Sequence, residues 1–469
     1  MQFNSSVFAL FLAVLLALYG VVRRAGARKA LLLVASYLFY AQWDWRYLSL
    51  LVLSTGVDYI AGARMQAASQ PARRRLWLLA SLITNLGVLA TFKYGNFLLG
   101  SLDPLWSQFG IVVPELPTEI PVGISFYTFQ TLSYTIDIYR RKTKPTKSLL
   151  DFALFVSFFP QLVAGPIVRS TEFLPQLKSM QNLQAERVAS GLQRFLLGLF
   201  KKVVIADNVA LFVDNVFASP GEHGALTLWC GAWGFALQIY CDFSAYTDMA
   251  LGAARAFGFK LPENFDAPYL SRSITEFWRR WHLSLSSWLR DYLYIPLGGS
   301  RHGAAKTYRN LMATMLLGGL WHGASWTFVL WGGLHGLFLA VERLRGVRVE
   351  EDASAGWTLG AIVRGLFTFQ LVSITWVVFR ASDFTELGIY VERMLTAWDG
   401  PSHGVDMGLR WAGALALLSI GQLFMRRFDW QHTIWNRLPA AAQGAALAGL
   451  LLLVSAFQTE GVAFLYFQF

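Results

Sequence analysis

The chain has 469 residues, of which 55% are hydrophobic and 15% are charged, and its mean hydropathy is +0.42. A soluble domain has about a quarter of its residues charged, so this composition excludes an ordinary soluble protein and predicts a polytopic membrane protein. The net charge of +11 is spread over short basic clusters between apolar runs. This distribution argues against nucleic-acid binding and is typical of cytoplasmic loops beside membrane spans and lipid headgroups.

The first apolar run, residues 5–22, is followed by basic residues at 23–29 and has no signal-peptide cleavage site. It is therefore predicted to be a retained span with a periplasmic N-terminus. At about 20 residues per crossing, the chain predicts an all-α fold of about ten or eleven transmembrane helices. We expect one integral-membrane domain, 1–469, with a motif-bearing core at about 150–345. The candidate spans are residues 5–22, 30–41 continuing into 46–63, 76–99, 120–139, 190–217, 225–257, 308–345 as two short passes, 359–379, 408–425 and 441–459.

Two segments interrupt this pattern. Residues 158–170 are apolar but contain Pro160 and Pro166, which remove backbone donors, so we expect a re-entrant segment covered by protein. In residues 267–303, a capping-box sequence at 273–276 precedes apolar residues at helical spacing. This second segment predicts an amphipathic helix at the cytoplasmic interface.

Several carboxylates and two cysteines lie within apolar sequence. Asp242 and Asp248 are six residues apart on one predicted helix, so their side chains face different directions and argue against a paired-carboxylate site. We expect both to form hydrogen bonds between helices. Cys230 and Cys241 are predicted core residues, and no sequence pattern indicates a metal site.

His322 lies in the apolar sequence GGLWHG, residues 318–323, whose glycines permit close helix approach or a break. A neutral imidazole there suits a general base, but a hydrogen-bonded structural histidine and a metal or haem ligand are alternatives. His335 follows 13 residues later, about 20 Å along an unbroken helix, so it shares a site only if the chain bends at Gly332–Gly333. His282 lies at the edge of the predicted amphipathic face, where a surface position is the alternative to a role at a cavity mouth.

Four motifs occupy the middle 40% or so of the chain: FFPQLVAGPIVR (158–169), YCDFSAYTDMALG (240–252), ENFDAPYLSRSITEFWRRWHLSLSSWLRDYLYIPLGGSR (263–301) and GGLWHGASWTFVLWGGLHG (318–336). Together they resemble the membrane-bound O-acyltransferase family, and within it the bacterial alginate O-acetyltransferase branch. The resemblance implies a multi-spanning fold with a buried catalytic histidine, which is His322 in the Trp-His-Gly motif. Many eukaryotic members of that family have asparagine at the position comparable to His282.

The resemblance implies acyl transfer from a cytoplasmic thioester. Acetyl-CoA is the expected donor substrate, with no bound cofactor and no metal. His322 is the predicted catalytic base, and His282 is a second candidate catalytic residue. Arginines near the predicted interfacial helix suit CoA phosphates, with lipid-headgroup anchoring as the alternative. The residues predicted to bind substrate or donor are Trp321, Trp278, Arg279, Arg280, Asn310 and His335.

The acceptor implied by the resemblance is an exported polysaccharide, either alginate or cellulose. The expected partners are periplasmic polysaccharide-acetylating proteins and an exopolysaccharide synthase complex, and the expected location is the bacterial inner membrane. Two alternatives need no bond formation by this chain. One is a transporter of acyl groups or glycan, and the other is a scaffold for an exopolysaccharide synthase.

Overall fold

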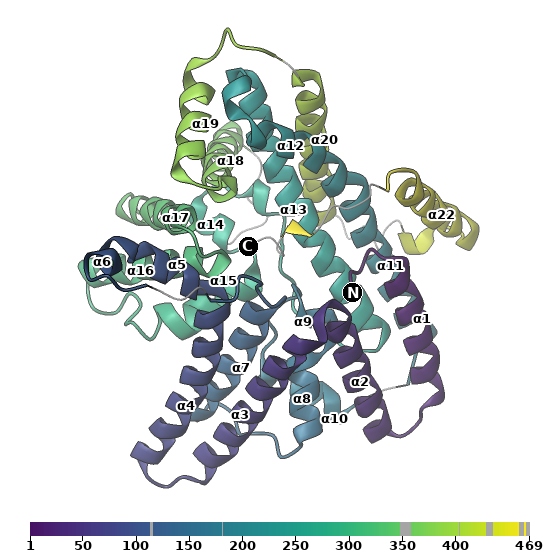
Figure 1. Cartoon of the computed structure of the whole chain (residues 1–469). Coiled ribbons are helices and arrows are strands. Elements are labelled where there is room, and N and C mark those ends of the chain that lie inside the picture. The colour runs from purple at the N-terminus through teal and green to yellow at the C-terminus, as the bar shows by residue number, and fades with distance from the viewer. Residues whose placement is uncertain are drawn as a thin grey trace. The chain divides into compact units, whose positions relative to one another are not determined.

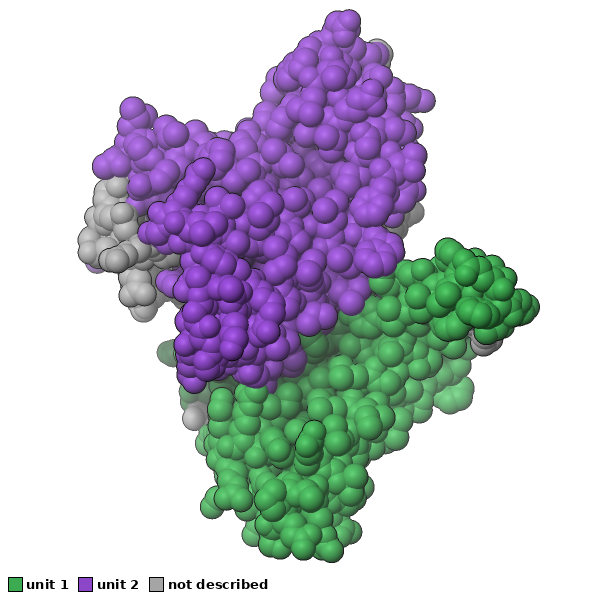
Figure 2. Space-filling model, turned by 90° about the vertical axis from the view of Figure 1, so that its left-hand side faces the viewer, with its two compact units in different colours: residues 1–195, 246–262 green, residues 196–245, 263–469 purple. Residues whose placement is uncertain are grey.

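The computed structural model describes residues 1–112, 116–180, 182–347, 358–402, 404–427, 435–458 and 464–465, and every element within these ranges is a helix (Figure 1). The prediction of an all-α fold is therefore confirmed. The contacts divide the chain into two compact units, each built from two stretches of sequence (Figure 2). Unit 1 comprises residues 1–195 and 246–262, and unit 2 comprises residues 196–245 and 263–469. The single-domain organisation stays a prediction.

Unit 1 is an assembly of short and medium helices in which α3, α4 and α7 pack side by side (Figure 1). Two long helices, α11 (Ala185–Phe200) and α13 (Ala225–Ala256), contribute residues to both units. The other elements of unit 1 are α1 (Ser6–Val21), α2 (Ala25–Asp44), η1 (Trp45–Tyr47), α3 (Leu48–Ala67), α4 (Pro71–Leu89), η2 (Ala90–Tyr94), α5 (Gly95–Ser101), α6 (Asp103–Gln108), α7 (Ile124–Tyr139), α8 (Leu149–Ser157), α9 (Phe159–Leu162) and α10 (Ser170–Lys178).

A buried polar cluster links the α3, α4 and α7 bundle. The carboxylate of Asp58 on α3 accepts hydrogen bonds from Ser81 Oγ at 2.5 Å and from Asn85 Nδ2 at 2.9 Å, both on α4. Ser81 Oγ also lies 3.1 Å from Thr135 Oγ1 on α7. Because a buried carboxylate is costly unless it is hydrogen-bonded, these contacts explain how Asp58 is tolerated in an apolar helix.

The proline-containing segment at 158–170 is broken and covered by protein, as the sequence predicts. Residues 158–168 are all buried, and helix α9 is only four residues long. The free backbone donor of Phe159 is satisfied by Ser36 Oγ at 3.0 Å. A Cβ at Gly123, whose φ is +77°, would lie 2.3 Å from the carbonyl oxygen of Leu162, so only glycine fits this approach. Re-entry of the segment into a membrane stays a prediction.

Unit 2 carries the histidines and the aromatic core around them. The predicted pair of short passes at 308–345 corresponds to two helices, α16 and α17, and their crossing of a membrane stays a prediction. The elements of unit 2 are η3 (Lys201–Ala206), α12 (Asp207–Ala218), η4 (Pro220–Glu222), η5 (Pro268–Leu270), α14 (Ile274–Trp278), α15 (Leu283–Leu289), η6 (Arg290–Tyr294), α16 (Ala304–His322), α17 (Trp326–Leu344), α18 (Leu359–Arg380), α19 (Phe384–Thr396), α20 (Val405–Arg427), η7 (Trp435–Arg437) and α22 (Ala440–Ala456).

The expectation of one continuous amphipathic helix from residue 273 was wrong. The segment forms α14, a turn at 279–282, α15 and the π-helical turn η6. Periodicity alone could not show this break, because Asn264 binds the chain at the turn. Its carbonyl accepts from the N–H of Leu283 at 3.0 Å, and its side chain accepts from the N–H of Ser284 at 3.2 Å. The capping box is confirmed, since Ser273 Oγ accepts from the N–H of Glu276 at 3.0 Å.

Buried charges in unit 2 form a compact cluster. Lys202 Nζ lies 2.7 Å from a carboxylate oxygen of Asp207 and 2.7 Å from one of Asp242, and all three side chains are buried. Asp242 also accepts from the N–H of Leu465 at 2.7 Å. In unit 1, Asp248 pairs instead with Arg194 at 2.8 Å. Asp242 and Asp248 thus have separate partners on other elements, as predicted.

By length and composition alone, two helices in the described ranges are long and apolar enough to cross a membrane, Pro71–Ser101 and Leu359–Arg380. Two shorter helices, Ser6–Val21 and Ala440–Ala456, are also apolar. The other predicted spans do not meet this criterion. One of them, at 190–217, carries the buried charges of Lys202 and Asp207.

Candidate active site

The helical hairpin of α16 and α17 places His322 within unit 2. The chain reverses at residues 323–325, where Ser325 caps α17 by accepting from the N–H of Thr327 at 3.3 Å. A Cβ at Gly319 would lie 2.2 Å from the carbonyl oxygen of Phe328, and one at Gly332 would lie 2.2 Å from that of Met315. These glycines therefore let the two helices touch through their backbones, as the sequence predicted for the residues around His322.

His322 is the last residue of α16 and lies in a buried aromatic pocket. Its ring centroid is 5.0 Å from that of Trp321, 5.2 Å from that of Trp331 and 5.3 Å from that of Phe379, each in an edge-on arrangement. These side chains come from α16, α17 and α18. The setting excludes bulk water and holds the imidazole in one place, which are two requirements of a catalytic base.

The position of His322 at the end of α16 also has an electrostatic consequence. The last carbonyl groups of a helix lack intrahelical partners and carry the negative end of the helix dipole. The helix that carries His322 would therefore stabilise a positive charge on its ring.

His282 is buried in the turn before α15, so the alternative of a surface histidine was wrong. Its ring lies 4.7 Å from that of Phe243 and 5.8 Å from that of Trp321, measured between centroids. Trp321 in turn contacts His322, so the two predicted catalytic histidines lie on either side of one indole. Burial lowers the pKa of the His282 ring below its ordinary value, which keeps the ring neutral.

His335 is also buried, but its connection to His322 differs from the one that the sequence suggested. Helix α17 is continuous through Gly332–Gly333, and the chain turns back before it, at residues 323–325. The bend at Gly332–Gly333 that a shared site would require is therefore absent. The reversal places the ring of Trp331 4.7 Å from that of His335 and 5.2 Å from that of His322. Trp331 thus separates the two imidazoles.

A cavity of about 1160 Å³ opens on unit 2 between α14, α15, α16 and α17. Three of the basic residues on its wall are Arg279, Arg290 and Arg343, and hydroxyl groups of Ser286 and Tyr308 are among its polar lining. Such a mixture of arginines, hydroxyls and apolar side chains suits a ligand with phosphate groups and an apolar or amide-bearing arm.

The predicted donor-binding residues divide between this cavity and the packing around it. Trp278 and Arg279 line the cavity. Arg280 forms an ion pair with Glu276 one helical turn earlier. Asn310 is buried and donates to the carbonyl of Gly299 at 3.1 Å, so it holds the loop before α16. Trp321 and His335 lie in the aromatic core described above. The donor-binding roles of all six residues stay predictions.

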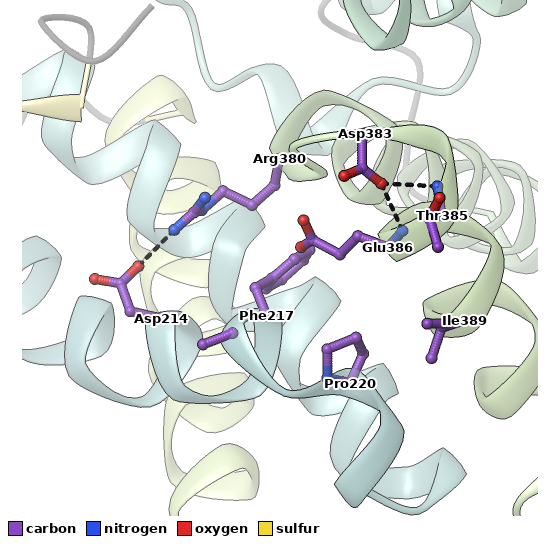
Figure 3. A pocket seen from close by; sticks show the side chains of 9 residues that line it. Asp214, Phe217, Pro220, Arg380, Asp383, Thr385, Glu386 and Ile389 are labelled. Atoms are coloured by element: carbon purple, nitrogen blue, oxygen red, sulfur yellow. Dashed lines mark hydrogen bonds and ion pairs between the residues drawn. The ribbon is translucent and has the colours of Figure 1, made fainter.

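A second cavity, of about 440 Å³, lies between the end of α12, the end of α18 and the start of α19 (Figure 3). Arg380 reaches across it to Asp214 at 3.0 Å, and Asp383 caps α19 by accepting from the N–H of Thr385 at 2.7 Å and of Glu386 at 2.8 Å. Arg380 directly follows Phe379, which touches His322. This cavity therefore lies near the histidine end of α18, whereas the larger one lies along α16.

Sequence reasoning missed three residues that shape the site. Phe379 and Thr375 are on α18, far from His322 in the sequence and within an apolar run that carries no distinguishing pattern. Glu342, on α17, accepts from the N–H groups of Ile274 at 2.6 Å and Thr275 at 2.9 Å, and thereby fixes the start of α14. The one sequence feature that could have drawn attention to Glu342 is that it is an acidic residue at the start of a basic stretch.

Together, the helical fold, the buried histidine and the arginine-lined cavity suit a multi-helix membrane enzyme. Residues 124–381 match the membrane-bound O-acyltransferase (MBOAT) family, and the chain belongs to this family. A probable alginate O-acetylase, AlgI, from Azotobacter vinelandii is 47% identical over 391 residues, which are 82% of this chain and 76% of the relative. A peptidoglycan O-acetyltransferase from Helicobacter pylori is 40% identical over 381 residues, 76% of this chain and 71% of the relative. A teichoic acid D-alanyltransferase from Bacillus subtilis is 25% identical over 299 residues, 60% of this chain and 75% of the relative.

Family membership confirms three of the predictions made from the sequence. The chain is a membrane protein, its fold is the MBOAT fold, and it is an O-acyltransferase. The alternatives of a transporter or a scaffold without catalysis lose their support. The resemblance to the alginate O-acetyltransferase branch is also confirmed, since several alginate O-acetylases match over 82% of the chain or more.

Proposed function

We propose that this protein, in the bacterial inner membrane, takes the acetyl group of cytoplasmic acetyl-CoA and transfers it to an acceptor hydroxyl. The transfer serves the O-acetylation of an exported polysaccharide. The observation that carries the proposal is the placement of His322. It ends helix α16 in a buried aromatic pocket, and the arginine-lined cavity of about 1160 Å³ runs along the same helix.

The geometry of α16 connects this cavity to His322. Met315 lines the cavity and lies seven residues before His322. Seven residues are nearly two full helical turns, so the two side chains share one face of the helix, about 10 Å apart along its axis. CoA has a long, flexible arm between its phosphates and its thioester. In this proposal the phosphates stay near Arg279, Arg290 and Arg343 while the arm extends along α16 and presents the thioester to His322.

His322 acts in the proposed reaction as a general base and then as a general acid. Its ring accepts the proton of the acceptor hydroxyl as the hydroxyl oxygen attacks the thioester carbonyl carbon. The tetrahedral intermediate collapses when the carbon–sulfur bond breaks, and the imidazolium returns the proton to the leaving thiolate. The products are an acetyl ester and free CoA. Donors to the oxyanion are expected from backbone N–H groups or indole N–H groups of the pocket.

The acceptor approaches in this proposal from the side of the second cavity, next to Phe379. We place that cavity at the periplasmic face, because the basic loops mark the other end of the helices as cytoplasmic. Its wall carries the carboxylates of Asp214, Asp383 and Glu386 against one guanidinium, that of Arg380. An anionic polymer such as alginate is repelled by such a wall. This supports hand-over through a periplasmic partner protein rather than direct binding of the polymer, and leaves alginate and cellulose as candidate final acceptors.

The test compares wild type, His322→Ala and His302→Ala, each expressed with its periplasmic acetylation proteins. His302 is an exposed histidine in the loop before α16, so it provides a matched control. Membranes receive acetyl-CoA with a radiolabelled acetyl group, and label is counted in the remaining acetyl-CoA, in protein and in polysaccharide. We expect His322→Ala to lose about 10²–10⁴-fold of the transfer rate and His302→Ala to match wild type. A folded His322→Ala protein with the wild-type rate would refute the assignment of the base.

A further inference from the structure

His335 has no exposed surface, and both of its ring nitrogens have partners on other helices. Trp278 Nε1, on α14, donates to His335 Nδ1 at 3.2 Å. An indole nitrogen can only donate, so Nδ1 is the unprotonated nitrogen and the proton is on Nε2. His335 Nε2 then donates to Thr375 Oγ1, on α18, at 3.0 Å. The hydroxyl of Thr375 is free to accept, because it donates its own proton to the carbonyl of Val372 at 2.7 Å.

This chain of hydrogen bonds is consistent in only one direction, so it fixes one tautomer of His335. Neither nitrogen is available to take a proton from a substrate, although a neutral histidine in an enzyme core would otherwise be a candidate base. The bonds instead tie together three helices, α14, α17 and α18. They also fix the plane of the imidazole, because two hydrogen bonds from opposite edges allow no rotation of the ring.

The orientation of His335 matters because of what its ring touches. The ring of Trp331, one helical turn earlier on α17, lies 4.7 Å from it and has no exposed surface. Trp331 also stacks on Trp376 at 5.7 Å with an interplanar angle of 19°. The ring of His322 lies 5.2 Å from that of Trp331, in an edge-on arrangement. The indole thus contacts His335, Trp376 and His322 at once.

We propose that His335 is a positioning residue, whose hydrogen bonds to Trp278 and Thr375 hold the indole of Trp331 against His322 and so orient the imidazole of His322 for acetyl transfer. The inference rests on the proposed function of His322. It also links the donor cavity to the base, because Trp278 lines that cavity. Displacement of catalytic groups by about 1 Å can cost about 10²-fold in rate, so a residue that acts only through Trp331 has a measurable effect.

The test uses Thr375→Val and Thr375→Ser as a matched pair, with His335→Phe as the stronger variant. Valine has nearly the shape of threonine but cannot accept the bond from His335, whereas serine can. We expect Thr375→Val to lower kcat about 10-fold and His335→Phe about 10²-fold, with the KM for acetyl-CoA unchanged. Thr375→Ser should keep the wild-type kcat. If His335→Phe does not fold, the threonine pair decides the question alone, and equal kcat values for Thr375→Val and Thr375→Ser would overturn the proposal.

Two further measurements separate positioning from a general loss of stability. In a Trp331→Phe background, Thr375→Val should have little additional effect on kcat, because the indole that transmits the effect is absent. A fully additive loss would overturn the proposal. Nitrogen-15 NMR of histidine-labelled protein in lipid nanodiscs should show His335 with a proton on Nε2 alone, and a shifted His322 signal in Thr375→Val. Either result is independent of activity, so it stands even if His322→Ala keeps its activity and the proposed base is wrong.

Discussion

The arginines of the large cavity provide the sharpest test of where the donor binds. Arg279, Arg290 and Arg343 line this cavity and are all exposed, and the side chain of Arg290 is 63% exposed and paired with Asp291 at 2.8 Å. Replacing all three with glutamine removes three positive charges and keeps side chains of similar length. If these residues hold the phosphates of CoA, the KM for acetyl-CoA should rise while kcat stays near the wild-type value.

The size of the effect follows from the exposure of these groups. Ion pairs of exposed side chains contribute about 0.2–1 kcal/mol each, because water screens them and long side chains lose entropy when they are held. Three such contacts are therefore expected to raise the KM about 3- to 100-fold, at about 1.4 kcal/mol for each factor of ten. Added salt should reduce the difference between variant and wild type, since ions screen exposed charges.

The assay measures initial rates of acetyl transfer with acetyl-CoA and with acetyl-pantetheine, which has the same thioester and no phosphate. The triple variant should be impaired with acetyl-CoA and should match wild type with acetyl-pantetheine. Arg410→Gln provides a control for charge alone, because Arg410 is 82% exposed and lies on α20, away from the cavity lining. Equal impairment with both donors, or no impairment with acetyl-CoA, would refute the assignment of the cavity to the CoA phosphates.

Two other substitutions test the packing of unit 2. Gly332→Ala places a Cβ 2.2 Å from the carbonyl oxygen of Met315, so it should separate α16 from α17 and lower the unfolding temperature in a thermal unfolding assay. Gly413→Ala on α20 is the control, because no atom lies within 4 Å of the added Cβ. It should leave the unfolding temperature unchanged. Lys202→Met leaves two buried carboxylates without their cation, at a cost of about 3–5 kcal/mol, so the yield of folded protein should fall. The triple variant Lys202→Met, Asp207→Asn, Asp242→Asn should recover much of that yield. A triple variant with a yield as low as that of the single variant would contradict this explanation.

Much of the fold could be predicted because membrane helices are set by local composition. The α16 and α17 hairpin, the broken segment at 158–170 and the different directions of Asp242 and Asp248 all follow from residues close together in the sequence. His322 was identifiable in the same way, from glycines that allow helices to touch and an imidazole in an apolar run. In each case the controlling contacts are within a helix or between neighbouring helices.

The parts that could not be predicted depend on contacts between distant residues. Phe379 closes the pocket of His322 from α18, and nothing distinguishes it from the other apolar residues of that helix. The turn between α14 and α15 is stabilised by Asn264, which competes with a pattern that favours one helix. The position of the chain reversal could not be predicted either. The sequence offered Gly332–Gly333 as the place where a bend would bring His335 to His322, whereas Gly332 serves close helix packing and the chain reverses at residues 323–325, before α17.

The backbone at His282 is compatible with the asparagine that the family resemblance implies at this position in many eukaryotic members. His282 has a φ of +43°, in the left-handed region that most side chains avoid. Asparagine, aspartate and histidine are the residues that tolerate this region best apart from glycine. An asparagine and a histidine therefore fit the same turn without a change of fold. The difference between them lies in what the side chain reaches, and here the ring packs against Phe243 and Trp321. Because Trp321 also contacts His322, exchanging the residue at 282 alters the pocket of the proposed base while the main chain stays in place.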